Sequence, residues 1–258
     1  RRQRKGVIDT TNFGQADAAF FLVGGFNCLG SLTDITHEME AITEQSDTLG
    51  DAWVEHSYVG VRKAHLTQKG FYDDGVGSVH EMLSTGPGVS RVLCYGLEGT
   101  ATGKNFVGFS GALETKYTRQ PARGVLHKAA ADYLGNGIVD QGKLVHMLNP
   151  RTASGNPTGR PLDHGASSTN GGAGYLQVNA LNSSGAPFVA RLRHSSDNIT
   201  YANLGSAFAG VASAAVPSAE RQSIATGAME RYIAADWTFT GGSATNASVT
   251  FFVGLARY

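Results

Sequence analysis

The segment most similar to a catalytic motif is Gly108-Phe109-Ser110-Gly111-Ala112, which differs from the nucleophile elbow G-x-S-x-G at Ala112. An elbow holds its serine on a sharp turn between a strand and a helix. Here a strand-like pattern continues past the serine instead. We therefore predict that Ser110 is an ordinary strand hydroxyl and not a nucleophile.

A phosphate-binding loop is suggested by Gly103-Lys104, but two of its required residues are missing. Glu98 stands where the first glycine belongs, and Asn105 stands where serine or threonine should bind a metal ion. The sequence therefore predicts a glycine-rich hairpin loop at this place.

The eight histidines are scattered, and no two have the i, i+4 spacing of a helical metal site. His65 and His127 lie on expected strands, which leaves a strand-to-strand site open. Hydrogen-bonded surface or interface histidines are the simpler interpretation. We predict no metal, no cofactor and no catalytic residues, and hence no enzyme.

Asp73-Asp74 could suggest a pair of catalytic carboxylates, but helix capping explains them as well. Val76, Val79, Met82 and Leu83 follow at helical spacing, and Gly86-Pro87-Gly88 ends the pattern. The sequence thus predicts one short helix over residues 73–83.

The composition favours an all-β chain that is rich in turns. Charged residues make up 16% of the chain, against roughly 25% in typical soluble domains, and there are 34 glycines in 258 residues. A low content of charged residues is also typical of a protein whose surface is partly covered by partner proteins. The formal net charge of +0 provides no overall field that would attract nucleic acid.

Two further features of the sequence leave alternatives open. The basic run Arg1, Arg2, Arg4 and Lys5 fits either a solvated tail or an arm that docks on an acidic neighbour. Cys28 and Cys94 lie in apolar settings without metal-ligand spacing, so we expect two buried free thiols, although a disulfide is compatible with the sequence. No stretch approaches the ~18 apolar residues of a membrane helix.

Apolar runs and period-two alternation predict strands through the first 150 residues. In residues 61–71, Ala64 and Leu66 point to one face while Lys63, His65, Thr67 and Lys69 point to the other. In residues 113–117, Glu114 and Lys116 are expected to face outwards. The other expected strands are residues 20–26, 33–48, 91–95, 105–109, 125–134 and 143–148.

Residues 48–60 form a long polar and aromatic segment that we predict to be a loop held against the following strand. Such a loop suits a protein that assembles with copies of itself. The candidate subunit-interface residues are Leu49, Asp51, Trp53, Glu55, His56, Tyr58 and Arg62.

Residues 151–174 are rich in Gly, Pro and Ser and are expected to be a linker. We predict an N-terminal arm (1–19), a β domain (20–150), this linker, and a C-terminal β-sandwich (175–258). In the last unit, residues 232–239 and 249–255 are expected to pair as a hairpin.

Several segments together resemble structural proteins of long-tailed bacteriophages, most closely tail tube (major tail) proteins. They are Phe21-Leu22-Val23-Gly24-Gly25-Phe26, Thr48-Leu49-Gly50-Asp51-Ala52-Trp53, Gly70-Phe71-Tyr72-Asp73-Asp74, and residues 124–128 and 137–146. The resemblance covers roughly the first 150 residues. Residues 192–197, 229–233 and 252–258 look like β domains appended to such proteins.

This resemblance implies a tail-tube-like β-sandwich or barrel of antiparallel sheets with one flanking helix, followed by a second small β-sandwich. It also implies a virion protein, assembled in the host cytoplasm, whose copies form rings, commonly hexameric. The rings stack into a tube that contacts other tail proteins, and phage DNA passes through it without specific recognition.

A different class of function stays open for the C-terminal unit. Tyr175, Tyr201, Tyr232 and Trp237 could form an aromatic surface that binds receptor carbohydrate, or the unit could decorate the virion. Alternatively, Trp237 and Phe239 share one strand face and fill the core. Exposed neighbouring aromatic rings would favour binding, and burial would favour the core.

Overall fold

The computed structural model describes residues 20–46, 56–73, 75, 79–152, 154–155, 161–240 and 243–258. In these ranges the chain forms antiparallel strands, one α-helix and two 3-10 turns, so the prediction of an all-β fold with one short helix is confirmed. The elements in chain order are β1 (Phe20–Val23), β2 (Phe26–Asn27), β3 (Leu32–Gln45), β4 (His56–Phe71), α1 (Val79–Ser84), β5 (Ser90–Gly96), β6 (Asn105–Gln120), β7 (Lys128–Gly135), β8 (Val139–Arg151), β9 (Leu162–Asp163), β10 (Gly172–Ser184), β11 (Phe188–Ser195), β12 (Ala202–Asn203), β13 (Ser218–Ile224), β14 (Tyr232–Phe239) and β15 (Ser243–Arg257).

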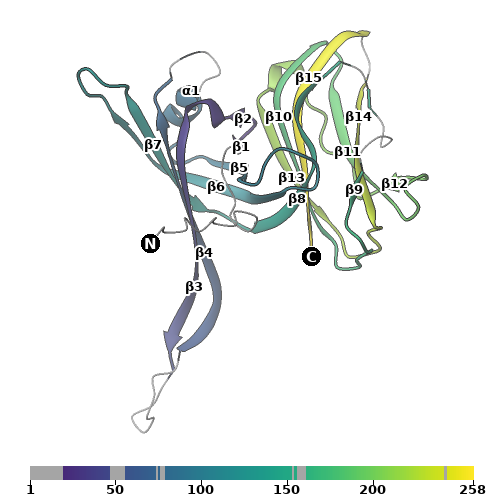
Figure 1. Cartoon of the computed structure of the whole chain (residues 1–258), viewed down its shortest axis with the longest axis horizontal. Coiled ribbons are helices and arrows are strands. Elements are labelled where there is room, and N and C mark those ends of the chain that lie inside the picture. The colour runs from purple at the N-terminus through teal and green to yellow at the C-terminus, as the bar shows by residue number, and fades with distance from the viewer. Residues whose placement is uncertain are drawn as a thin grey trace, which may run out of the picture.

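The described strands form one large and one small sheet (Figure 1). The large sheet runs in the order β13-β10-β15-β8-β6-β5-β1-β2, and β7, β4 and β3 extend it from β6. The small sheet has the order β12-β11-β14-β9. Because β15 pairs with β8, strands from both halves of the chain share one sheet. The division at residues 151–174 stays a prediction; β9 lies within that segment and β10 begins in it.

The main path of the large sheet curls until its two ends meet. Gly25, in the turn between β1 and β2, donates its N–H to Gln177 Oε1 of β10 at 2.6 Å, and Gln177 Nε2 donates to the carbonyl of Val92 in β5 at 3.2 Å. The curl encloses aromatic rings so tightly that a Cβ on Gly108 would lie 2.6 Å from the ring of Tyr175. The two ends of the sheet are therefore joined by side-chain hydrogen bonds of Gln177, and not by backbone pairing between strands.

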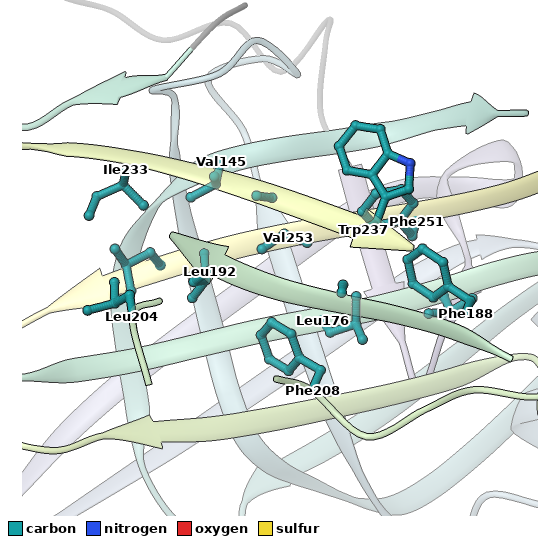
Figure 2. Packing of buried hydrophobic residues seen from close by; sticks show 14 of the residues in the cluster. Val145, Leu176, Phe188, Leu192, Leu204, Phe208, Ile233, Trp237, Phe251 and Val253 are labelled. Carbon is teal, nitrogen blue, oxygen red and sulfur yellow. The ribbon is translucent and has the colours of Figure 1, made fainter. Parts of the chain in front are cut away.

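The small sheet covers the outer face of β8, β10 and β15 and forms a sandwich with them (Figure 2). Trp237 of β14 packs 5.3 Å from Phe251 of β15, measured between ring centroids, and Phe188 of β11 lies 4.8 Å from Phe251. The predicted hairpin of residues 232–239 and 249–255 is therefore wrong, since β14 and β15 belong to opposite sheets. Both strands turn an apolar face to the same core, from opposite sides of the sandwich.

In the N-terminal part, α1 and β3, β4, β6 and β7 enclose a second core. Leu66 and Gln68 of β4 point into it, whereas Lys63 and Lys69 are exposed, which confirms the predicted alternation of this strand. Buried Tyr133 of β7 donates its hydroxyl to Gln68 Oε1 at 3.2 Å. The inward polar side chain thus keeps its hydrogen bond.

The helix α1 corresponds to the helix predicted over residues 73–83, of which residues 74 and 76–78 lie outside the described part of the chain. It spans Val79–Ser84 and buries Val79, Met82 and Leu83. Asp73 Oδ1 accepts the N–H of Gly75 at 3.0 Å in a local turn, and the predicted cap at Asp73-Asp74 stays a prediction.

The expectation that Glu114 faces outwards is wrong, because its side chain is completely buried. A register shift between Glu114 and Lys116 in the pairing with β7 turns the carboxylate inwards against Gly86. Neither carboxylate oxygen has a hydrogen-bond partner among the described residues, and Arg91 Nη1 lies 3.9 Å away. Burial raises the pKa of Glu114 to about 7, and Arg91 opposes this only in part.

We expect Glu114 to make the protein less stable as the pH rises. Its pKa is about 7 in the folded state and close to 4.5 when unfolded, so the folded state holds the proton more tightly. The stabilisation that this tighter proton binding gives the folded state is complete below pH ~4.5 and is lost as the pH rises to ~7. The free energy of unfolding falls by at most about 3 kcal/mol over this range. The measurement is urea unfolding at several pH values for the wild type and for Glu114→Gln. Because other buried groups titrate nearby, the difference between the two proteins isolates Glu114; parallel pH curves would contradict the assignment.

Candidate assembly surface

The strands β3 and β4 continue beyond the rest of their sheet as a two-stranded ribbon (Figure 1). β7 pairs with residues 65–71 of β4, so among the described residues β3 is the one strand that pairs with residues 56–64. The register shifts between Ala41 and Thr43, opposite Gly60. Gly60 has φ +87°, a conformation that side chains disfavour, so a glycine is needed at this bulge.

Both faces of this ribbon are open to solvent. Met39 is 54% exposed, and Tyr58 and Val61 are each 51% exposed. An isolated two-stranded ribbon is marginally stable in water, since it has no sheet or helix against which to bury such side chains. The ribbon is therefore a surface suited to a partner.

Charges on the two strands are segregated by sign. β3 carries four acidic residues and no lysine or arginine, whereas β4 carries three basic residues and no acid. Across the pair, Lys69 Nζ lies 3.4 Å from Asp34 Oδ2, with both side chains about half exposed. Such an exposed pair contributes little stability. The acidic residues are Asp34, Glu38, Glu40 and Glu44, and the basic ones are Arg62, Lys63 and Lys69.

The four strands β3, β4, β7 and β6 also have two unpaired edges. Among the described residues, β3 pairs only with β4, and residues 115–120 of β6 pair only with β7. The first edge is acidic, whereas the second carries Lys116 and Arg119. Unpaired N–H and C=O groups along an edge are templates for pairing with another strand.

The turn after the β6 edge exposes apolar side chains between basic ones. Val125 is 62% exposed and Leu126 is 71% exposed. Arg123 precedes them and Lys128 follows, and both are exposed. An exposed apolar tip with a charged rim has the composition of a contact surface.

The structure places three of the predicted interface residues on this surface. His56, Tyr58 and Arg62 lie on β4 and are exposed, so residues 56–60 form a strand and not the predicted loop. The two unpaired edges could not be predicted from residue type alone. The opposite charges of β3 and of residues 115–120 of β6 are visible in the sequence and could have indicated that these segments attract each other. The other predicted interface and arm residues lie outside the described residues; they are Leu49, Asp51, Trp53, Glu55, Arg1, Arg2, Arg4 and Lys5.

The residues considered for chemistry take structural positions. Ser110 Oγ accepts the N–H of Ile138 at 2.7 Å in the loop between β7 and β8. Cys28 and Cys94 are both buried and free, as expected from the sequence, and burial raises the pKa of the Cys28 thiol to about 12. In the described ranges, no three His, Cys, Asp or Glu side chains gather in the way that a metal site requires.

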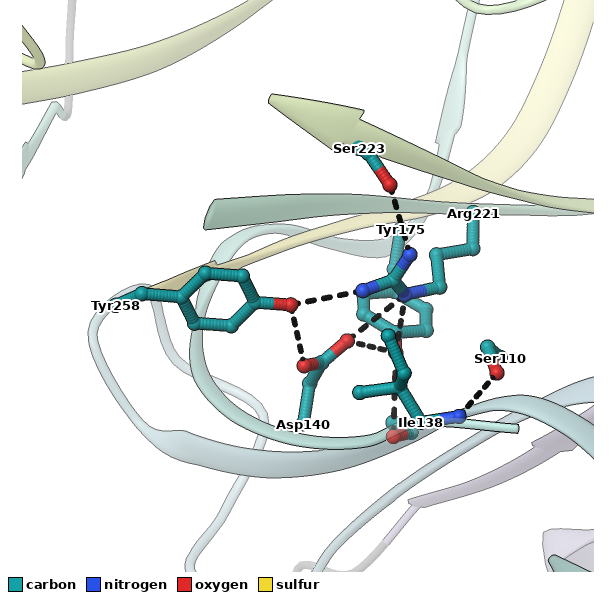
Figure 3. Close-up of polar contacts among 8 residues, drawn as sticks. Ser110, Ile138, Asp140, Tyr175, Arg221, Ser223 and Tyr258 are labelled. Carbon is teal, nitrogen blue, oxygen red and sulfur yellow. Dashed lines mark hydrogen bonds and ion pairs between the residues drawn. The ribbon is translucent and has the colours of Figure 1, made fainter. Parts of the chain in front are cut away.

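The aromatic residues proposed for sugar binding do not form an exposed platform. Tyr175 is fully buried and Trp237 is 9% exposed. The Tyr175 hydroxyl donates to Asp140 Oδ2 at 2.5 Å, where Arg221 and Tyr258 also converge (Figure 3). The expectation that Trp237 belongs to the core is confirmed.

Comparisons with known proteins find limited structural similarity to solved structures and no similarity to family models or curated sequences. No family model matches the chain, and no curated protein matches it. Among solved structures, a chain in the virion of a native gene transfer agent particle is 13% identical, with a TM-score of 0.38 over 47% of this chain and 92% of its own. A chain of the sheath-tube complex of an extracellular contractile injection system, in the extended state, is 10% identical, with a TM-score of 0.40 over 51% of this chain and 93% of its own.

A third solved structure spans nearly the whole molecule. It is the Dit protein of SPP1, described as a paradigm of the hub adsorption apparatus in phages that infect Gram-positive bacteria. It is 9% identical, with a TM-score of 0.32 over 93% of this chain and 99% of its own. None of these TM-scores reaches 0.5, so the chain's own geometry and sequence carry the proposal below. No helix in the described ranges is long and apolar enough to span a membrane.

Proposed function

We propose that the chain is a non-enzymatic structural protein of a bacteriophage tail that assembles with copies of itself into stacked rings, forming the tail tube. The observation that carries the proposal is the pair of unpaired, oppositely charged edges on the sheet of β3, β4, β7 and β6. The sequence resemblance to tail tube proteins supports the same role.

The strand directions are compatible with a closed ring. Each of the neighbouring pairs β3–β4, β4–β7 and β7–β6 is antiparallel, so β6 runs opposite to β3. If the four-stranded unit is repeated by rotation about an axis along the strands, β3 of one copy lies antiparallel to β6 of the next. Repetition of one such head-to-tail contact closes a ring when the rotation divides the full circle.

Charge favours that order of contacts. The β3 edge carries Glu38 and Glu40, while the β6 edge carries Lys116 and Arg119. A β3 edge therefore repels another β3 edge and attracts a β6 edge. The rings are proposed to be hexameric, to stack through the N-terminal arm and residues 48–60, and to contact other tail proteins. Phage DNA would pass through them in the virion, after assembly in the host cytoplasm.

Negative-stain electron microscopy of the purified protein over a concentration series tests this function. We expect rings or tubes with a central hole to increase with concentration, because each head-to-tail contact is concentration dependent. Uniform monomers at every concentration would count against the proposal. They would favour the alternative, in which the chain is a decoration or receptor-binding β module.

A further inference from the structure

A cavity of about 560 Å³ lies where the end of β5, the start of β6, β8, and the end of β15 meet the residue after β9. Part of its wall is apolar, with Leu97 and Leu255 among the lining residues. Lys143, His164 and Arg257 supply the basic part of the wall. This cavity is separate from the two sheet edges described above, which share no lining residue with it.

The two cations of this wall have no acidic partner among the described residues. Lys143 and Arg257 make no ion pair there, and both side chains are only half-buried. Arg257 Nη1 donates to the carbonyl of Ala166 at 2.8 Å, which fixes the guanidinium in place. Partly desolvated cations without counter-charges make a site attractive to anions.

His164 provides a third polar side chain in this wall. Its Nε2 is buried and has no hydrogen-bond partner among the described residues. Burial lowers the pKa of His164 to about 4, and the charges of Arg257 and Lys143 lower it further in the same direction. The imidazole is therefore neutral at pH 7, and in one tautomer its Nε2–H is a free donor.

The nearby carboxylates do not cancel this positive charge. Glu98 also lines the cavity, but it is exposed to solvent and both of its oxygens accept from Asn105 Nδ2, at 3.0 and 2.8 Å. Asp163, next to His164 in the chain, is held by two hydrogen bonds from Arg231 at 2.8 and 2.7 Å. The acids are thus engaged elsewhere or screened by water.

We propose that this cavity binds a phosphate group, with Lys143 and Arg257 neutralising its charge. A rotation of the His164 imidazole that exposes Nε2–H would let this group donate to one oxygen. The cavity is larger than a phosphate ion, which occupies only part of such a volume. The apolar wall at Leu97 and Leu255 would hold a small organic group esterified to the phosphate. This site is independent of ring assembly.

The test is a titration of the full-length protein, at constant ionic strength and pH 7, with inorganic phosphate and separately with glycerol phosphate. The readout is the histidine ring signals in NMR spectra. We expect a saturable shift of the His164 signal and a rise of its pKa, because a bound anion stabilises the imidazolium. Lys143→Gln and Arg257→Gln should each weaken binding about tenfold, the effect of losing one charged contact. Lys128→Gln, an exposed change on β7, should leave binding unchanged.

Two results would overturn the proposal. One is a shift that stays linear with both probes, and the other is an equal loss of binding in the Lys128→Gln control. Tighter binding of glycerol phosphate than of inorganic phosphate would identify an organic ester as the ligand, and equal binding would identify the free anion. Each variant is first compared with the wild type by its amide NMR spectrum. His164→Gln, which retains a donor, provides a second variant if a charge substitution unfolds the protein.

Discussion

Replacing Asp140 with alanine is expected to lower the free energy of unfolding by about 3–5 kcal/mol, as the loss of one partner of a buried ion pair does. Asp140 Oδ2 accepts from Arg221 Nε at 2.8 Å and from the Tyr175 hydroxyl at 2.5 Å, and its Oδ1 accepts from the Tyr258 hydroxyl at 2.7 Å (Figure 3). The side chains of Asp140 and Arg221 are 1% and 10% exposed. Alanine would leave the guanidinium buried and unpaired.

The effect should be large because this one carboxylate connects several strands. Asp140 lies on β8, Tyr175 on β10 and Arg221 on β13, so the network spans the curled sheet at the place where its strands come from both halves of the chain. Urea unfolding of the variant measures the change. Asp140→Asn retains one acceptor oxygen and the shape of the side chain, and is expected to lose less stability than Asp140→Ala.

Asp163→Ala is the matched control. Arg231 binds Asp163 as closely as Arg221 binds Asp140, with an Nη2–Oδ2 distance of 2.7 Å, but both side chains of this pair are about half exposed. Water replaces the lost contact there, so the unfolding midpoint should hardly move. If both alanine variants lost equal stability, burial would not be the cause and the interpretation of the Asp140 network would be wrong.

The sequence predicts strands well where one face of a strand is covered and the other is wet. In β4 the alternation of Leu66 and Gln68 with Lys63 and Lys69 identifies the strand and its inward face. β10 has no such alternation, because Tyr175, Leu176, Gln177 and Val178 are all buried. One face of β10 packs into the core inside the curled sheet, and the other packs into the core of the sandwich. Because both faces are apolar, the sequence of this strand has no period-two alternation from which to predict it.

Errors arise where tertiary contacts override local pattern. Glu114 looks like an outward strand residue, but a bulge in β6 reverses its direction. The apolar strands β14 and β15 look like a hairpin because a Gly-rich segment joins them. Each instead finds a better-matched neighbour far away in the sequence, so pairing cannot be deduced from adjacency.

The candidate assembly surface was predictable only in part. Exposed Tyr58 and Arg62 follow from residue type, since an aromatic or guanidinium group in a polar segment is typical of contacts. The complementary edge of β6 depends on which strands pair with which, and β5 ends its pairing with β6 at Ser90 opposite Leu113. A sequence gives the charges of Lys116 and Arg119. It does not show that, among the described residues, this part of β6 pairs with β7 on one side and with no strand on the other.

Reversing charge on one edge is expected to abolish ring assembly, or to raise the concentration that it requires at least about tenfold, since apposed like charges cost several kcal/mol. The triple change Glu38→Lys, Glu40→Gln and Glu44→Lys makes the β3 edge basic, because it takes the formal charge of β3 from −4 to +1. The two new lysines face His65 and Ser57 across the ribbon, so neither creates a pair of lysines. Arg119→Glu with Arg123→Glu makes the β6 edge acidic, because only Lys116 then opposes two carboxylates there, and the cross-strand partner of Arg119 is Ala129. Sedimentation velocity and electron microscopy measure the assembly of each variant.

The decisive experiment mixes the two variants. The first has two basic edges and the second has two acidic edges, so neither can contact itself, while each offers both of the edges that the other needs. Head-to-tail pairing of β3 with β6 therefore predicts that an equimolar mixture assembles again, and only into rings with an even number of subunits. A single chain with all five substitutions has both edges inverted and should assemble alone. If both variants assembled unaided, or if neither the mixture nor the combined variant recovered, these edges would not form the subunit contact.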